Sequence, residues 1–167
     1  MQILCPRLYV NSVHQIDLNA LKQSGIRGII VDLDNTLVPW NEDAEFPKAV
    51  AWLKKVKDMG MLVCIVSNNH PRRAKTLAGT FDIPFIWQAV KPRRRAFRKA
   101  MQMMMIDKSQ TAVVGDQVFT DILGGNRLGL YTILVRPLKK QEFFGTRIVR
   151  QVEKVILFSL RRRGHLK

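Results

Sequence analysis

Short apolar runs alternate regularly with longer segments of helical periodicity along most of the sequence. The apolar runs are continuous and rich in β-branched residues, which is typical of strands buried on both faces. This alternation predicts an α/β fold, a Rossmann-like parallel sheet with helices on both faces. Strands are expected at 28–33, 61–66, 84–87, 111–114 and 131–135, and helices at 48–59, 71–80, 92–105 and 120–128.

The length of the chain, 167 residues with 47% apolar, suits one domain with a packed core. We therefore expect a single domain over 1–167, in which 141–167 forms a basic C-terminal helix or tail. The formal charge of +15 predicts attraction to polyanions, namely nucleic acid, anionic lipid headgroups or phosphorylated substrates. The sequence shows no secretory signal and no apolar run of about 18 residues. We expect a cytoplasmic protein whose membrane contact, if it has any, is peripheral at the inner membrane surface.

Polar side chains gather where the predicted strands end. Because the carboxyl ends of parallel strands meet at one edge of a sheet, we expect these side chains to share one crevice. The candidate residues are Asp32, Asp34, Thr36, Ser67, Asn68, Lys91, Asp116 and Asp121.

Their chemistry suits a phosphate group and a cation. Asp32, Asp34 and Asp116 form an oxygen-rich set that fits Mg²⁺, a hard cation that substrate phosphate helps to coordinate. Lys91 would bring a compact positive charge to the phosphoryl oxygens, and the Ser67 hydroxyl with nearby N–H groups would donate to them. Taken alone, each residue has an ordinary explanation, but their joint order predicts a phosphate site.

Four motifs resemble those of the haloacid dehalogenase (HAD) superfamily. They are DLDNTL at 32–37, Ser67 in an SNN triplet, Lys91 in a KP pair and GDQVFTD at 115–121. The segments at 25–40 and 89–92 resemble more closely the YqeG family, which includes phosphatidylglycerophosphate phosphatases. The resemblance implies a HAD-like, Mg²⁺-dependent phosphatase that passes through an aspartyl-phosphate.

The resemblance also implies a role for each motif residue. Asp32 would be the nucleophile and Asp34 the general acid and base. Thr36 would orient the first motif, and Asp121 would orient Lys91 or a water molecule. The implied phosphate-binding residues are Thr36, Ser67, Asn68 and Lys91, and the implied metal ligands are Asp32, Asp34 through its backbone carbonyl, and Asp116.

The short segments between the first three motifs leave no room for a cap domain. The site should therefore be open and accept a phosphate displayed on a large molecule. The resemblance implies that this substrate is an anionic phospholipid, phosphatidylglycerophosphate, which becomes phosphatidylglycerol. The alternatives are a phosphatase for nucleic acid or nucleotides, and a non-catalytic protein that binds RNA or the ribosome, since the basic surface suits both.

Two basic segments leave alternatives open. The segment 146–163 is either an amphipathic helix at an anionic membrane surface or a helix packed on the domain with a basic tail. In the first case one apolar face would be lined by Ile148, Val152, Val155, Ile156 and either Ser159 or Leu160. The run Arg93–Arg95 either receives a second phosphate or forms a solvated surface.

Overall fold

The computed structural model describes residues 2–39, 46–69, 71–139 and 144–162. Its centre is a six-stranded sheet in the order β1-β6-β5-β2-β3-β4, in which every neighbouring pair is parallel. The strands are β1 Leu8–Val10, β2 Gly28–Val31, β3 Leu62–Val66, β4 Phe85–Ile86, β5 Thr111–Gly115 and β6 Tyr131–Val135. The predicted parallel α/β sheet is confirmed.

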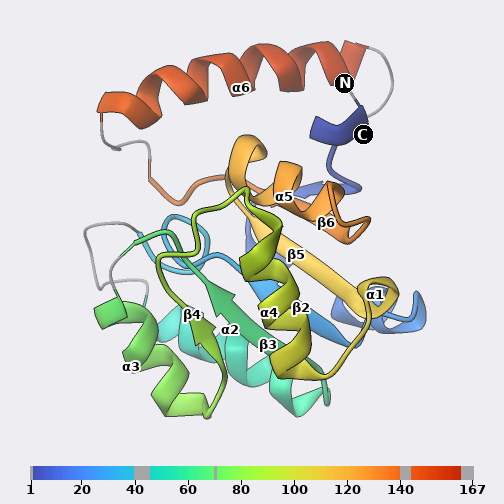
Figure 1. The fold of residues 1–167 in the computed structure, drawn as a ribbon, viewed down its shortest axis with the longest axis vertical. Coiled ribbons are helices and arrows are strands. Elements are labelled where there is room, and N and C mark those ends of the chain that lie inside the picture. The colour runs from blue at the N-terminus through green and yellow to red at the C-terminus, as the bar shows by residue number, and fades with distance from the viewer. Residues whose placement is uncertain (1, 40–45, 70, 140–143, 163–167) are drawn as a thin grey trace.

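Helices cover both faces of this sheet (Figure 1). They are α1 Leu18–Gln23, α2 Phe46–Asp58, α3 Pro71–Phe81, α4 Arg94–Met104, α5 Leu123–Asn126 and α6 Phe144–Arg162, with a π-helical turn η4 at Val118–Ile122 and short 3₁₀ turns at Gln2–Leu4, Val13–Gln15 and Lys108–Gln110. The sequence patterns did not predict β1 or α1, which span three and six residues. The helix expected at 120–128 is instead η4 followed by α5.

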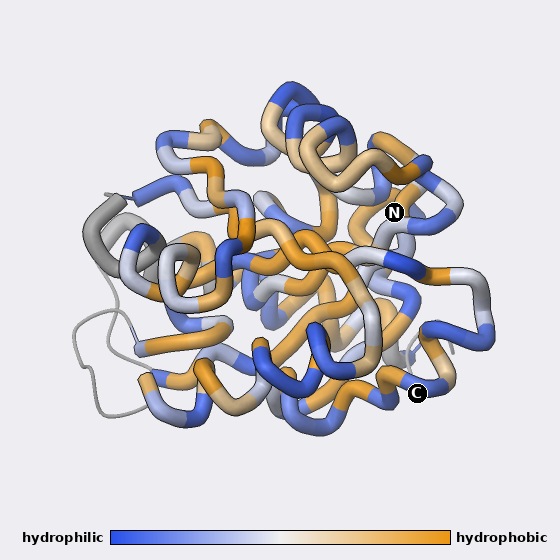
Figure 2. The backbone as a smooth tube through the Cα atoms, turned by 90° about the horizontal axis from the view of Figure 1, so that it is seen from below, coloured by the Kyte–Doolittle hydropathy of each residue, from blue (hydrophilic) through white to orange (hydrophobic). Residues whose placement is uncertain are grey.

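Consecutive residues of the central strands point to opposite faces, as in any strand. In β2, Ile29 packs in one cluster with Trp52 of α2, and Ile30 packs in another with Phe97 of α4. Because both faces are covered, every residue of β2 is buried. Figure 2 shows the apolar segments gathered in the middle of the molecule. This double covering leaves the carboxyl edge of the sheet as the place where polar residues can meet.

The connections that could carry a cap domain are short. The described residues between β2 and β3 contain α2, and those between β3 and β4 contain α3. Among the described residues these connections hold no cap domain, as the spacing of the motifs predicted.

The helix α6 lies along one end of the molecule (Figure 1) and packs on it through one face. Glu153 and Leu160 are buried on this face, whereas Val155 and Phe158 are exposed. Packing on the domain is therefore observed, and Leu160 does not belong to the exposed apolar face. Of the predicted tail at 141–167, residues 141–143 and 163–167 lie outside the described ranges. Within those ranges, no helix combines the length and the apolar character needed to cross a bilayer.

Candidate active site

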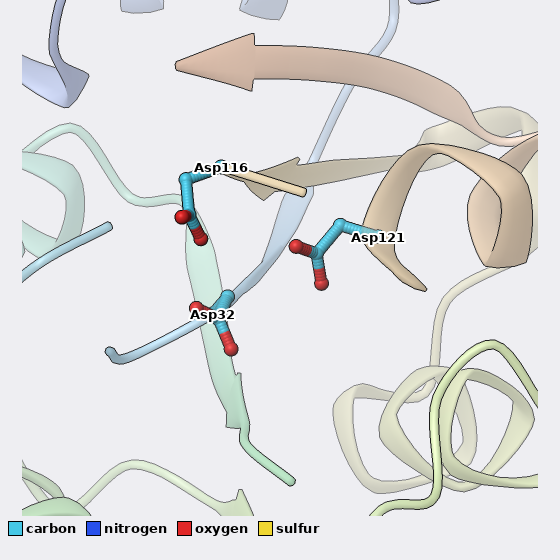
Figure 3. A group of neighbouring side chains, drawn as sticks. All are labelled: Asp32, Asp116 and Asp121. Atoms are coloured by element: carbon cyan, nitrogen blue, oxygen red, sulfur yellow. The ribbon is translucent and has the colours of Figure 1, made fainter. Parts of the chain in front are cut away.

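Three buried carboxylates face one another at the carboxyl edge of the sheet (Figure 3). Asp32 follows β2, Asp116 follows β5, and Asp121 lies in η4. One carboxylate oxygen of each lies within 4.8 Å of those of the other two. The strands β2 and β5 are neighbours with Val31 paired to Val114, so the residues that follow them emerge side by side.

Lys91 bridges two of these carboxylates. Its Nζ donates to Asp32 Oδ1 at 2.5 Å and to Asp121 Oδ1 at 2.7 Å. Burial lowers the pKa of Lys91, but the charges of Asp121 and Asp32 and their hydrogen bonds more than reverse this and leave the pKa raised. The side chain is therefore an ammonium group at neutral pH.

Burial and the neighbouring carboxylates disfavour the ionised form of Asp32 in spite of Lys91. Burial raises the pKa of Asp32, Lys91 lowers it, and the nearby charges of Asp121 and Asp116 raise it again, so that the pKa stands well above its ordinary value. A cation beside Asp32 would oppose this shift and keep the carboxylate ionised.

Hydrogen bonds hold each of these carboxylates in place. Asp121 Oδ1 accepts from Lys91, and Asp121 Oδ2 accepts from the backbone N–H of Gln117 at 3.2 Å. The Thr36 hydroxyl lies 3.2 Å from Asp32 Oδ2 and 3.1 Å from Asp116 Oδ1, and its single proton can be donated to either. Asp32 and Asp116 therefore present oxygens to the same space, and an all-oxygen donor set fits a divalent cation such as Mg²⁺.

Two local features of the sequence shape these loops. A Cβ at Gly115 would lie 2.2 Å from Asp121 Cγ, so only glycine lets this side chain approach the end of β5. Asn35 adopts φ 62°, a left-handed conformation that asparagine tolerates better than most residues. The turn is closed by the Asn35 N–H, which donates to the carbonyl of Val38 at 2.7 Å.

Asp34 lies at the same edge but outside the group of three carboxylates. Its Oδ2 accepts hydrogen bonds from Ser67 Oγ at 3.1 Å and from Asn69 Nδ2 at 2.9 Å. The sequence reasoning did not include Asn69, although its place in the SNN triplet was a signal for it. Asn68 Oδ1 accepts from the backbone N–H of Lys91 at 2.8 Å, so this amide ties the loop after β3 to Lys91. The predicted phosphate contacts of Thr36, Ser67 and Asn68 thus involve groups that also organise the site.

Comparison with known proteins places this arrangement in a family. Residues 1–138 match the family described as mitochondrial PGP phosphatase, where PGP denotes phosphatidylglycerophosphate. The chain belongs to this family. It is 44% identical to the probable phosphatase YqeG of Bacillus subtilis over 97% of this chain and 94% of that protein.

More distant relatives agree with this assignment. A chloroplastic and mitochondrial phosphatidylglycerophosphate phosphatase 1 of Arabidopsis thaliana is 30% identical over 98% of this chain, which spans half of that protein. The cobalt-bound deoxy-D-mannose-octulosonate 8-phosphate phosphatase of Haemophilus influenzae shares the fold with a TM-score of 0.53 at 18% identity, over 81% of this chain and 90% of that one. The chain is therefore a HAD-like phosphatase, a hydrolase of phosphoric monoesters.

Proposed function

We propose that the chain removes the terminal phosphate of phosphatidylglycerophosphate in a Mg²⁺-dependent reaction that passes through an aspartyl-phosphate on Asp32. The observation that carries the proposal is the buried Lys91 bridge between Asp32 and Asp121, with Asp116 beside it. The family match and the names of the relatives support the choice of substrate.

In the first half of the reaction, an ionised oxygen of Asp32 attacks phosphorus. The bond between phosphorus and the ester oxygen breaks, and its electron pair stays on the leaving oxygen. Asp34 protonates that oxygen. Because Asp34 Oδ2 already accepts two hydrogen bonds, we assign the transferred proton to Oδ1. Lys91 stabilises the charge on the phosphoryl oxygens.

In the second half, Asp34 takes a proton from water, whose oxygen attacks the phosphorus of the aspartyl-phosphate. The bond between phosphorus and Asp32 breaks and inorganic phosphate leaves. Mg²⁺, held by Asp32, Asp116 and the Asp34 carbonyl, would neutralise carboxylate charge and orient the phosphoryl group. Asp121 keeps Lys91 in place through the hydrogen bond of 2.7 Å.

The capless site and the surface of the chain favour a substrate embedded in a membrane. On α6, Val155 and Phe158 are 68% and 63% exposed, on the side opposite the buried Glu153. The Arg162 guanidinium lies 6.0 Å from the centre of the Phe158 ring, so a basic group accompanies this apolar face. With the net charge of +15, this supports peripheral binding to an anionic bilayer on its cytoplasmic side.

Turnover assays test the reaction. The purified chain would be given phosphatidylglycerophosphate in micelles, glycerol phosphate, a 5′-phosphorylated oligonucleotide and an aryl phosphate, each with Mg²⁺ or with EDTA. We expect Mg²⁺-dependent release of phosphate that is fastest from the lipid. Asp32→Asn should abolish it, whereas Asp58→Asn, at an exposed carboxylate on α2, should not. Turnover of the oligonucleotide alone would exclude the lipid substrate, and no turnover would favour a binding protein.

Vesicle binding tests the membrane surface separately. Replacing both Val155 and Phe158 with serine should weaken binding to vesicles containing anionic lipid by about tenfold or more, since each buried apolar side chain contributes about 1.5–3 kcal/mol. Met103→Ser removes an exposed apolar side chain on α4 and serves as the control. Equal binding by the wild-type chain, the double serine variant and Met103→Ser would exclude α6 as the docking surface.

A further inference from the structure

The carboxylate of Glu153 is buried although it lies on a C-terminal helix that is distant in sequence from every motif. The residue is 3% exposed. Its Oε1 accepts hydrogen bonds from the backbone N–H groups of Val118 at 2.6 Å and Phe119 at 3.3 Å. Burial of a carboxylate is costly unless such donors replace water, so this contact is a specific one.

These two N–H groups belong to the loop that carries two of the active-site carboxylates. They lie between Asp116 and Asp121, at the start of η4. The residue preceding η4, Gln117, provides no side-chain cap, and its own N–H donates to Asp121 Oδ2. The first N–H groups of a helical turn need acceptors, and here α6 supplies the acceptor that the local sequence lacks.

We propose that Glu153 is a positioning residue for the phosphatase site, which it supports by fixing the loop from Asp116 to Asp121. This inference rests on the proposed roles of Asp116 as a metal ligand and of Asp121 as the anchor of Lys91. The family match ends at residue 138, so α6 adds a support from outside the matched segment.

Three variants separate the hydrogen bonds of Glu153 from the packing of α6. Glu153→Ala removes the acceptor, whereas Glu153→Gln keeps a carbonyl oxygen at the same place. Leu160→Ala removes packing at a fully buried position of α6 and keeps Glu153. All are compared with the wild-type chain by calorimetric titration with Mg²⁺, by thermal melting, and by hydrogen exchange of the metal-free protein over residues 116–122.

We expect Glu153→Ala to weaken Mg²⁺ binding by tenfold or more, as loss of a group supporting a metal ligand commonly does, and to speed exchange over 116–122. Glu153→Gln should stay within about threefold of wild type in Mg²⁺ affinity, because its carbonyl accepts the same bonds. Leu160→Ala should lower Tm at least as much as Glu153→Ala and leave Mg²⁺ affinity within about twofold, since the supporting acceptor remains.

The inference is overturned if Glu153→Ala matches wild type in exchange and affinity, or if Leu160→Ala weakens Mg²⁺ binding as much as Glu153→Ala does. A wild-type chain that binds no Mg²⁺ contradicts the proposed function instead. In that case the exchange over 116–122 still decides whether Glu153 fixes the loop.

Discussion

Replacing Lys91 with methionine should destabilise the metal-free protein far more than loss of an ordinary ion pair. The substitution leaves Asp32, Asp116 and Asp121 with oxygens within 4.8 Å of one another and no ammonium between them. At an effective dielectric constant of about 20, two unit charges at this distance repel by about 3.5 kcal/mol. The total repulsion energy has an upper limit, because one carboxyl group can take up a proton instead. At pH 7.5, about 3.5 units above the ordinary pKa of a carboxyl group, this protonation costs about 5 kcal/mol. We therefore expect a loss of about 3–5 kcal/mol at pH 7.5, the range seen when one partner of a buried pair is removed.

Urea unfolding in EDTA measures this loss. With a slope of about 2 kcal/mol per molar urea, the midpoint should fall by about 2 M. The control is Lys54→Met, which removes an exposed ion pair with Asp58 of 2.6 Å and should cost at most about 1 kcal/mol.

The dependence on pH has a definite sign. The pKa of Asp32 is already raised in the folded protein and should rise further without Lys91. A folded pKa above the unfolded one means that stability is retained at low pH and lost as pH rises through the folded value. The loss of unfolding free energy in Lys91→Met should therefore be smaller at pH 5 than at pH 7.5. It should also be smaller when Mg²⁺ replaces EDTA. Equal losses for Lys91→Met and Lys54→Met, or a deficit that is constant with pH, would refute the electrostatic reasoning.

Two further variants and one labelling experiment test other parts of the structure. Gly115→Ala should lower both kcat and Tm, because its Cβ would lie 2.2 Å from Asp121 Cγ and would displace Asp121 from Lys91. The control is Gly79→Ala, where a Cβ meets nothing within 4 Å. Equal kcat and Tm of the two variants would contradict the close approach of Asp121 to Gly115. Asp121→Asn should lower kcat more than it lowers Mg²⁺ affinity, since Asp121 holds Lys91; a loss of affinity alone would identify it as a ligand instead. Cys64 should resist iodoacetamide at pH 8 in the folded protein, because burial raises its pKa to about 12, and mass spectrometry showing equal labelling with and without urea would contradict this.

The sequence predicted most of the sheet because its central strands are largely buried and mostly apolar. It failed at β1, because its apolar run of three half-buried residues, Leu8–Val10, is too short to indicate a strand. β1 pairs with β6, which lies more than a hundred residues later in the sequence, through partners such as Tyr9 and Leu134. Such a short edge strand is determined by its tertiary partner more than by its own pattern.

The site was predictable to the extent that strand ends determine it. Asp32 and Asp116 meet because their strands are neighbours, and the order of the motifs indicated this. Side-chain direction was harder to infer. Asp32 and Asp34 are two residues apart and would point the same way on a regular strand, but β2 ends at Val31 and the chain turns at Asn35. The Asp34 carboxylate consequently bonds to Ser67 and stays apart from the other three.

The role of α6 shows why periodicity alone could not decide between a packed helix and a membrane helix. An acidic residue within a basic amphipathic segment suggests solvent exposure, yet Glu153 is among the most buried residues of α6. Glu153 is buried because it accepts hydrogen bonds from backbone N–H groups at the start of η4, which point toward α6. When α6 packs on the domain in this way, Val155 and Phe158 face outward. The two predictions for this segment, a packed helix and a helix at a membrane surface, therefore concern opposite faces of the same helix. Binding to a bilayer through the outer face would therefore leave the contact of Glu153 with Val118 and Phe119 intact.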